Sequence, residues 1–243
     1  MERIRENAYN SYIKTHLAHL TKPSLEDLKK QSHVFKARFG PFLPADRRSK
    51  ILELGCGHGA LLYFLKENGY TSVEAVDVSP EQVSLAQSFG FRNVACEDLM
   101  DFLQSCEPGS YQMVFMLDVI EHFRKDEISG LLGLAWNSLK QGGRLVIYTP
   151  NAEGLFGARY RYFDLTHEIA FTPQSLAQVL RLSGFERIQF RPVEPYVHGL
   201  ISLARWMVWK TIKMFLRLYL LAETGVYRGY LLTQLMIAVA EKS

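Results

Sequence analysis

The sequence predicts an α/β protein with helices on both faces of a Rossmann-like, doubly wound and mostly parallel sheet. Three observations support this fold class. Short apolar runs typical of buried strands alternate with segments of helical periodicity. A glycine-rich segment at residues 55–59 lies between the first run and the first helix, where such folds bind ligands. Acidic residues follow successive runs, and the carboxyl ends of parallel strands meet at one edge of a sheet.

Each expected strand is a short apolar run bounded by turn residues. Tyr111–Leu117 is the clearest, because an apolar run interrupted only by Gln112 is typical of a strand buried on both faces. The alternation of strand and helix at this spacing favours a parallel sheet. The other expected strands are 51–54, 73–78, 93–96 and 144–148, with candidate sixth and seventh strands at 186–191 and 231–240.

The segments between these runs carry helix signals. Apolar residues repeat at helical spacing after the glycine-rich segment, and Asn68 with Gly69 ends that helix. Ser79 and Pro80 begin the next helix, which ends near Gly90, because proline is favoured at the first helical position. Further helices are expected over 128–139, ended by Gly142 and Gly143, and between Thr172 and Gly184.

Residues 1–47 are expected to form a polar helical extension, and residues 48–243 the α/β domain. Pro23 interrupts the extension, and the segment GPFLP at 40–44 is typical of a linker. Ser24 is expected to cap a helix, with Asp27 three residues later. The excess of Lys and Arg in the first 50 residues is typical of a solvated helical face.

Composition is that of a globular protein. The 243 residues are 48% hydrophobic, and the net charge of +3 indicates no particular partner. Three cysteines without metal-type spacing indicate reduced thiols and a cytoplasmic location. The N-terminal sequence lacks the apolar segment of a secretory signal, and no stretch of about 18 residues is free of charge, so no transmembrane span is expected. Nucleic acid is not an expected partner, because an RNA-binding motif of basic and aromatic residues is missing.

The segment 55–59 has the composition of a ligand-binding loop. Glycines allow a tight turn and let a ligand approach the backbone without a Cβ in the way. The spacing also satisfies a dinucleotide fingerprint, but Glu53 before the first glycine would repel a diphosphate and suits a cationic ligand. Asp77 could accept hydrogen bonds from ribose hydroxyls, and Asp98 from an adenine amino group. The alternative for each acid is a helix cap or a surface position.

Four ordered motifs resemble those of class I S-adenosylmethionine-dependent methyltransferases, most closely the ubiquinone-type O-methyltransferase superfamily. They are ILELGCGHG at 51–59, AVDVSP at 75–80, MLDVIEH at 116–122 and LKQGGRLVI at 139–147. The resemblance covers about residues 48–193 and implies S-adenosylmethionine as the cofactor. It also implies a seven-stranded sheet whose last strand is antiparallel.

The resemblance further implies cofactor contacts, residue by residue. The methionine moiety would contact Glu53, Gly55, Gly57 and Gly59. The ribose and one adenine face would contact Asp77 and Val78, and the adenine would contact Asp98 and Leu99. Leu117 and Asp118 would close the pocket near the methyl donor.

Four residues after the fourth and fifth strands are catalytic candidates. Methyl transfer mainly requires alignment of acceptor and donor, but a hydroxyl acceptor also benefits from a base. His167 is the preferred base, because imidazole titrates near working pH, and Asp164 could orient it. His122 is the rival base, and Glu121 is the fourth candidate. The absence of an N-P-P-Y-type signature favours oxygen over exocyclic nitrogen as the acceptor atom.

A metal-dependent site is an alternative. Asp118, Glu121 and His122 could bind a divalent cation, as in some relatives of the ubiquinone type. No metal is predicted, because the sequence shows no independent ligand cluster.

The loop at residues 151–171 is long enough to need a function. Arg159, Tyr160, Arg161 and Tyr162 are expected to bind the acceptor, because aromatic rings and arginines suit a sugar face, an aromatic ring or a phosphate-linked group. Alternatively, the aromatic residues cover the edge of the sheet.

A basic, amphipathic helix is expected at 199–221, within a helical insert at 195–229 before the last strand. Its four cationic residues fall within roughly 140° of one another, Trp206 and Trp209 share their side, and apolar residues occupy the opposite side. The pattern is typical of a helix in a membrane interface. The alternatives are packing on the protein's own sheet or a twin subunit in a homodimer, and a lid over the acceptor site. The cationic residues are Arg205, Lys210, Lys213 and Arg217.

These observations predict an O-methyltransferase acting on a sugar hydroxyl of a small-molecule or glycan acceptor. The segment YFDLTHEIAFT at 162–172, with the basic insert, is similar to methyltransferases of bacterial surface-glycan assembly, which implies a lipid-linked acceptor at the inner membrane face. The first alternative is a small phenol or quinone precursor as acceptor. A non-catalytic S-adenosylmethionine-binding regulator, a nucleic-acid methyltransferase and a dehydrogenase are less well supported.

Overall fold

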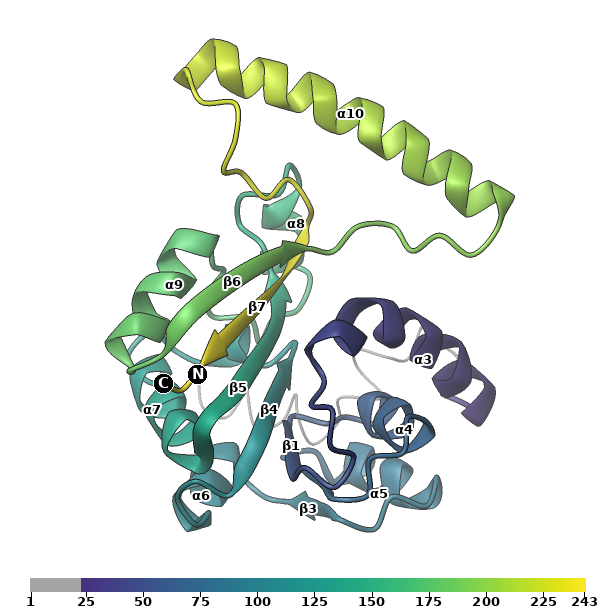
Figure 1. Cartoon of the computed structure of the whole chain (residues 1–243), viewed down its shortest axis with the longest axis vertical. Coiled ribbons are helices and arrows are strands. Elements are labelled where there is room, and N and C mark those ends of the chain that lie inside the picture. Colours follow the sequence, from purple (N-terminus) through teal and green to yellow (C-terminus); the bar gives the residue numbers. More distant parts are fainter. Residues whose placement is uncertain (1–22) are drawn as a thin grey trace.

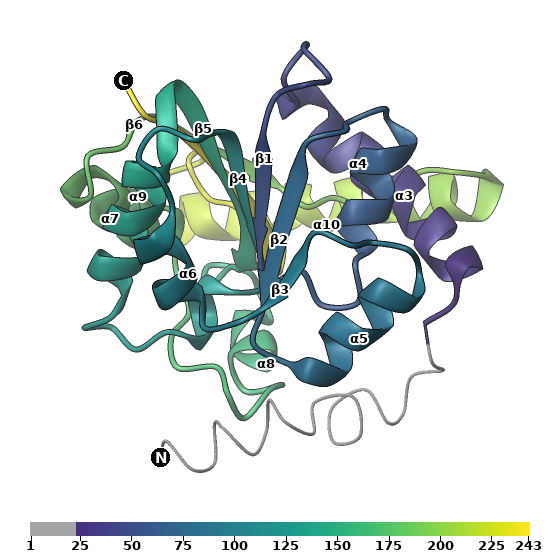
Figure 2. The ribbon, with the colours of Figure 1, turned by 90° about the horizontal axis from the view of Figure 1, so that it is seen from below.

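The computed structural model describes residues 23–243, and residues 1–22 of the predicted extension lie outside the described part. A seven-stranded sheet with the order β3-β2-β1-β4-β5-β7-β6 forms the centre (Figure 1). Helices α3, α4 and α5 cover one face of the sheet and α6, α7 and α9 the other (Figure 2). The predicted doubly wound α/β fold is therefore confirmed.

The strands follow the predicted apolar runs. Pairing is parallel from β3 through β5, and β7 is antiparallel to both β5 and β6, as the resemblance implied. The strands are β1 (Ile51–Leu54), β2 (Val73–Asp77), β3 (Val94–Cys96), β4 (Tyr111–Leu117), β5 (Leu139–Pro150), β6 (Glu186–Pro192) and β7 (Leu235–Glu241).

The helices include two short ones that the periodicity did not predict, α6 and α8, which have too few turns for a repeating apolar pattern. The α-helices are α3 (Leu25–Phe39), α4 (Ala60–Glu67), α5 (Pro80–Ser88), α6 (Leu99–Ser105), α7 (Ile128–Ser138), α8 (Gly157–Arg161), α9 (Pro173–Leu182) and α10 (Leu200–Thr224), with 3-10 turns η1 (Gly40–Phe42) and η2 (Ile120–His122).

The boundary between α7 and β5 differs from the prediction. Gly142 and Gly143 do not end the helix, which stops at Ser138. They lie within β5, where the register against β4 shifts between Tyr111 and Met113. The positive φ of Gly142 (71°) allows this irregularity, so glycines that resembled a helix stop serve a strand.

The described part of the N-terminal extension packs onto the domain. Ser24 caps α3 with Asp27 in a capping box, as predicted. Phe39 at the end of α3 is fully buried, and its ring lies 5.9 Å from that of Phe115 on β4 and 6.1 Å from that of Tyr148 on β5. Helix α3 therefore completes the core on one face of the sheet.

Helix α10 stands apart from the rest of the molecule, beyond the carboxyl ends of β5 and β6 (Figure 1). Two extended segments, 193–199 and 225–234, connect it to the sheet. Ser202 is the only buried residue of α10, so the apolar side of the helix does not pack on the sheet. Within residues 23–243, no helix is long and apolar enough to span a bilayer.

Candidate active site

A cavity of about 850 Å³ opens at the carboxyl ends of the parallel strands. Its walls are the β1–α4 turn, the ends of β2 and β4, the start of α6 and Phe35 of α3. All predicted cofactor-binding residues except Gly59 line it: Glu53, Gly55, Gly57, Asp77, Val78, Asp98, Leu99, Leu117 and Asp118. Sheet topology thus gathers residues from three of the four motifs, together with Asp98 and Leu99, around one space.

Glycine is required at two positions of the turn. Gly55 has a φ of +71°, and a Cβ there would overlap the Cγ2 of Val119. Gly59 has a φ of +89°, and its Cβ would lie 2.8 Å from the ring of Phe91. Gly59 therefore serves the entry into α4 rather than the wall of the cavity.

The carboxylate of Asp77 holds the turn in place. Its Oδ2 accepts a hydrogen bond from N of Gly57 (2.7 Å), and its Oδ1 accepts one from N of Ser79 (2.8 Å). Burial raises the pKa of Asp77, and these two N–H donors oppose that rise. Each oxygen retains acceptor capacity toward the cavity, as a ribose-binding carboxylate needs.

Glu53 is a buried acid at the wall of the cavity. The residue is only 2% exposed, and its Oε2 has no hydrogen-bond partner within residues 23–243. Burial raises the pKa of Glu53 well above its ordinary value, and the nearby Asp77 charge raises it further. A buried acid without a partner at a cavity indicates a missing donor, and the ammonium of S-adenosylmethionine is one of the right charge.

Asp98 is a helix cap at the border of the cavity. Its Oδ1 accepts hydrogen bonds from N of Met100 (2.7 Å) and Asp101 (3.3 Å), which makes it the N-cap of α6. It also lines the cavity. Adenine recognition by Asp98 stays a prediction.

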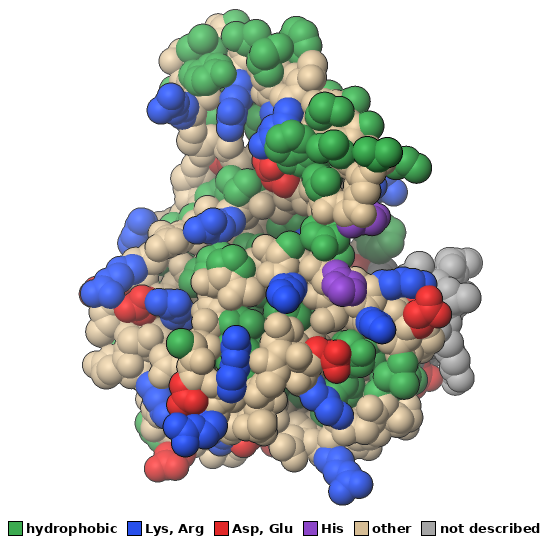
Figure 3. Space-filling view, turned by 45° about the vertical axis from the view of Figure 1, so that its right-hand side comes forward, with side chains coloured by type: hydrophobic (Ala, Val, Ile, Leu, Met, Phe, Trp, Pro, Cys, Tyr) green, Lys and Arg blue, Asp and Glu red, His purple; other side chains and the backbone are tan. Residues whose placement is uncertain are grey.

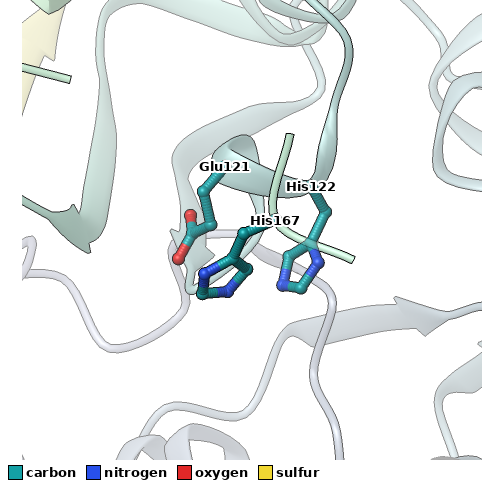
Figure 4. A group of neighbouring side chains, drawn as sticks. All are labelled: Glu121, His122 and His167. Carbon is teal, nitrogen blue, oxygen red and sulfur yellow. The ribbon is translucent and has the colours of Figure 1, made fainter. Parts of the chain in front are cut away.

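A cluster of three side chains, here called the histidine cluster, adjoins the cavity. Glu121 and His122 come from η2 after β4, and His167 comes from the long loop after β5 (Figure 4). Their ligand atoms lie within 4.8 Å of one another, and the two imidazole rings are 4.6 Å apart. His122 also lines the cavity, so the histidine cluster borders the predicted cofactor site.

Backbone hydrogen bonds bring the loop to η2. The carbonyl oxygen of Glu121 accepts from N of Glu168 (2.8 Å) and N of Ile169 (3.2 Å). Arg161 donates to the carbonyl oxygens of His167 and Glu168. The contacts that place His167 beside His122 therefore join residues about 45 positions apart in the chain.

Hydrogen bonds set the tautomers of both histidines. Thr166 Oγ1 donates to Oδ1 of Asp164 (2.6 Å), so it accepts from Nδ1–H of His122 (2.8 Å). Nδ1–H of His167 donates to the carbonyl oxygen of Tyr160 (2.8 Å). In both neutral rings the lone pair is therefore on Nε2. Through Thr166, Asp164 orients His122. Its predicted role toward His167 stays a prediction.

Two acids of the site, Glu121 of the histidine cluster and Asp118 of the cavity wall, have raised pKa values. Burial raises the pKa of Glu121 well above its ordinary value, with the Asp118 charge adding to the rise. Burial also raises the pKa of Asp118, against the opposing charge of Arg38. Asp118 has a φ of +53°, an uncommon backbone conformation that points to a functional constraint.

The predicted acceptor residues divide into two groups. Arg161 and the carbonyl of Tyr160 hold the loop through the hydrogen bonds described above. Arg159 and Tyr162 are exposed, as are the neighbouring Phe156 and Phe163. These aromatic residues do not cover the sheet edge, and their rings are accessible to a ligand.

Sequence reasoning missed several residues at the site. Phe35 lines the cavity, and Arg38 donates from Nη1 to the hydroxyl of Tyr148 (3.2 Å) at the end of β5. Thr166, which links Asp164 to His122, was also missed. No local pattern identifies Phe35 and Arg38, because α3 reaches the site only through tertiary packing. Thr166 acts through contacts with residues that the fold brings together.

The histidine cluster also has the composition of a metal site. One carboxylate and two imidazoles are ligands that suit several divalent transition metals. The set differs from the alternative drawn from the sequence, because His167 replaces Asp118. Removal of metal ions by a chelator distinguishes a metal-binding role of the histidine cluster from a role in proton transfer.

Comparison with known proteins agrees with this geometry. The tRNA U34 carboxymethyltransferase of Hydrogenovibrio crunogenus is 26% identical over 194 residues, which are 74% of this chain and 57% of that protein. The ubiquinone biosynthesis O-methyltransferase of Burkholderia thailandensis is 23% identical over 159 residues, 59% of this chain and 67% of that protein. The chain thus spans little more than half the length of the first relative.

A solved structure and a family model complete the comparison. A SAM-dependent methyltransferase from Archaeoglobus fulgidus superimposes with a TM-score of 0.65 at 21% identity, over 89% of this chain and 97% of that one, which shows a shared fold. The family model for a methyltransferase domain matches residues 5–189. The resemblance to class I methyltransferases is confirmed, and the chain belongs to the methyltransferase-domain family.

Proposed function

We propose that this protein transfers a methyl group from S-adenosylmethionine to a hydroxyl oxygen, and that the acceptor is a sugar of a glycan. The position of His122 carries the proposal. This residue lines the predicted cofactor cavity and contacts His167, so a proton acceptor borders the space where the methyl group would be presented.

The cavity residues fit the cofactor by charge and by hydrogen bonding. Glu53 offers a buried carboxylate to an ammonium group, and Asp77 offers acceptors to ribose hydroxyls. When bound, S-adenosylmethionine supplies a methyl group that its sulfonium activates. The chain then has to orient an acceptor and accept its proton.

The histidine cluster supplies the proton acceptor. In both imidazoles Nδ1–H is engaged with an oxygen acceptor, which leaves the basic lone pair on Nε2. Glu121 lies beside both rings, and its ionised form would stabilise an imidazolium. Proton acceptance is needed for a hydroxyl and supports oxygen as the acceptor atom.

The exposed loop supports a sugar as the acceptor. Tyr162 and Phe163 present accessible rings next to Arg159, and such surfaces stack on sugar faces and bind phosphate-linked groups. A phenol or quinone precursor is the second candidate. It is favoured by the similarity to a ubiquinone biosynthesis O-methyltransferase.

A radiolabel transfer assay tests the proposal. The purified chain is incubated with methyl-labelled S-adenosylmethionine and separate panels of nucleotide sugars, lipid-linked oligosaccharides, prenylated catechols and unmodified tRNA. Label in the sugar panels supports the proposal, and label only in the catechol panel supports the second candidate. Label only in tRNA, or cofactor binding without turnover on any acceptor, contradicts both.

Variants of the two histidines test the base. His167→Gln and His122→Gln should each lower kcat by about 10²–10⁴-fold if the residue transfers the proton, with little change in cofactor affinity. Tyr63→Phe on α4 is a control outside the cavity wall. Unchanged kcat in both histidine variants would contradict a role in catalysis.

A further inference from the structure

The apolar side of α10 faces away from the protein. Leu200, Met207, Val208, Phe215 and Leu218 have exposed fractions between 48% and 85%. With Thr211 and Met214 they fall within roughly 120° around the helix axis at 100° per residue, and we call this surface the outer face. In Figure 3, hydrophobic side chains cover the top of the molecule, which α10 forms.

The opposite side of α10 is held by an ion-pair network. Glu194, on the segment before the helix, pairs with Lys213 and with Lys210 (3.2 Å). Burial raises the pKa of Glu194, but hydrogen bonds and charge from the two lysines outweigh it and leave that pKa below its ordinary value. The side chain of Lys213 is only 12% exposed. Two of the four cations therefore orient the helix, with the outer face outward.

The other two cations flank the outer face. Arg205 and Arg217 lie roughly 120° to either side of its centre at 100° per residue. They form no ion pair with any residue of the described chain. Long arginine side chains extend from such positions toward a charged surface while their stems follow the apolar one.

The charge pattern distinguishes a lipid surface from a second copy of this chain. No acidic residue occurs between 199 and 222. Two outer faces packed together would bring arginines near arginines, and each helix carries a single carboxylate, Glu223, in its last turn. A surface of anionic headgroups supplies the missing charge, and its acyl region accepts the apolar side chains.

We infer that α10 docks this protein into the interface of a bilayer that contains anionic lipid, with the outer face in the acyl region and Arg205 and Arg217 at the headgroups. The helix is about 37 Å long and lies along the surface. Its two connecting segments join the sheet near the carboxyl ends of its parallel strands, the edge where the cavity opens. Docking does not depend on the proposed function. Only the assignment of an acceptor carried by the membrane would depend on it.

Vesicle flotation of the full chain tests the inference without cofactor or acceptor. Wild type should float with vesicles of phosphatidylglycerol and phosphatidylcholine, and much less with phosphatidylcholine alone. Phe215→Asp should lower the partition coefficient at least tenfold, because it places a charge in the acyl region. Arg205→Gln and Arg217→Gln should each lower it about fivefold and weaken its salt dependence.

Leu182→Asp is the matched control, because Leu182 is 77% exposed on α9, outside α10. It should float like wild type. Failure of folded wild type to float, or an equal loss in the α9 control, would overturn the inference. Self-association that Phe215→Asp abolishes, without flotation of wild type, would overturn it in favour of a homodimer. Since flotation needs no turnover, its outcome is independent of whether a glycan is methylated.

Discussion

Replacing Glu53 with glutamine should change protein stability and cofactor affinity in opposite directions. The apoprotein buries this acid without a hydrogen-bond partner for Oε2 among the described residues, which disfavours the folded state. The cofactor supplies an ammonium that the ionised acid can hold. Glu53→Gln removes the charge at nearly constant volume, so it removes both effects.

The stability gain is bounded by the pKa of Glu53. The pKa of Glu53 in the folded protein lies well above 4.5. Below pH 4.5 the acid is therefore protonated in both the folded and the unfolded chain, and it does not change the free energy of unfolding. As pH rises from 4.5 toward the folded pKa, the unfolded chain loses the proton first. The free energy of unfolding then falls by up to about 1.4 kcal/mol per pH unit, which bounds the penalty near 3 kcal/mol at pH 7.

Glutamine should recover about 1–2 kcal/mol of this penalty, because a buried amide without partners also costs free energy. For a chain of this size, each kcal/mol raises Tm by about 2–4 °C. The lost charge-assisted hydrogen bond is worth about 1.5–3 kcal/mol, so affinity for S-adenosylmethionine should fall roughly 10- to 150-fold. Affinity in the wild type should also rise with pH, because the ammonium binds the ionised acid.

Calorimetric melting and isothermal titration measure the two quantities. Glu74→Gln on β2 is the control, since Glu74 pairs with Lys50 (2.9 Å) and accepts from the Tyr111 hydroxyl (2.5 Å) outside the cavity wall. It should lower Tm and leave cofactor affinity unchanged. A Glu53→Gln protein that melts below wild type at pH 7, or binds the cofactor equally well, would refute this reasoning.

Three further predictions address the turn, the hydrogen-bond chain and the metal alternative. Gly142→Ala should cost about 1–2 kcal/mol in urea unfolding, because its φ is +71° but the new Cβ meets no atom of the described residues within 4 Å. Gly55→Ala, at the same φ, should cost more because it overlaps Val119, and equal costs would contradict the clash. Thr166→Val should lower kcat about tenfold and shift the pH–rate profile, because it breaks the link that orients His122, and Thr166→Ser should restore both. Chelation by EDTA should leave methyl transfer unchanged. A loss of activity that added Mg²⁺ or Zn²⁺ restores would make the histidine cluster a ligand set.

Local patterns in the sequence were sufficient for most of the sheet. Ile51–Leu54 and Tyr111–Leu117 are apolar runs interrupted by Glu53 and Gln112, and the structure places strands at these bounds. The positive φ values at Gly55, Gly57 and Gly59 match the tight turn predicted from their spacing. Local patterns misled where the same residue serves two kinds of structure, as Gly142 does within β5.

The candidate site was only partly predictable, because local patterns do not report contacts between distant segments. Residues at the ends of successive strands were predictable, because parallel strands place their carboxyl ends at one edge. The contact of α3 with the site through Arg38 and Tyr148, and the link from Asp164 to His122, depend on packing between distant segments. Asp164 lies three residues from His167 in the chain, and only the fold links it through Thr166 to His122.

The sequence by itself determined the fold class, the glycine turn with its acidic neighbours, and the amphipathic character of α10, because periodicity and spacing act over a few residues. Only the tertiary structure decided which histidines meet, which acid is buried without a partner, and which side of α10 faces outward. Those features depend on burial and on contacts between segments far apart in the chain. The pairing of Glu194 with Lys210 and Lys213 turns the apolar side of the helix outward, and no pattern within the helix specifies that direction.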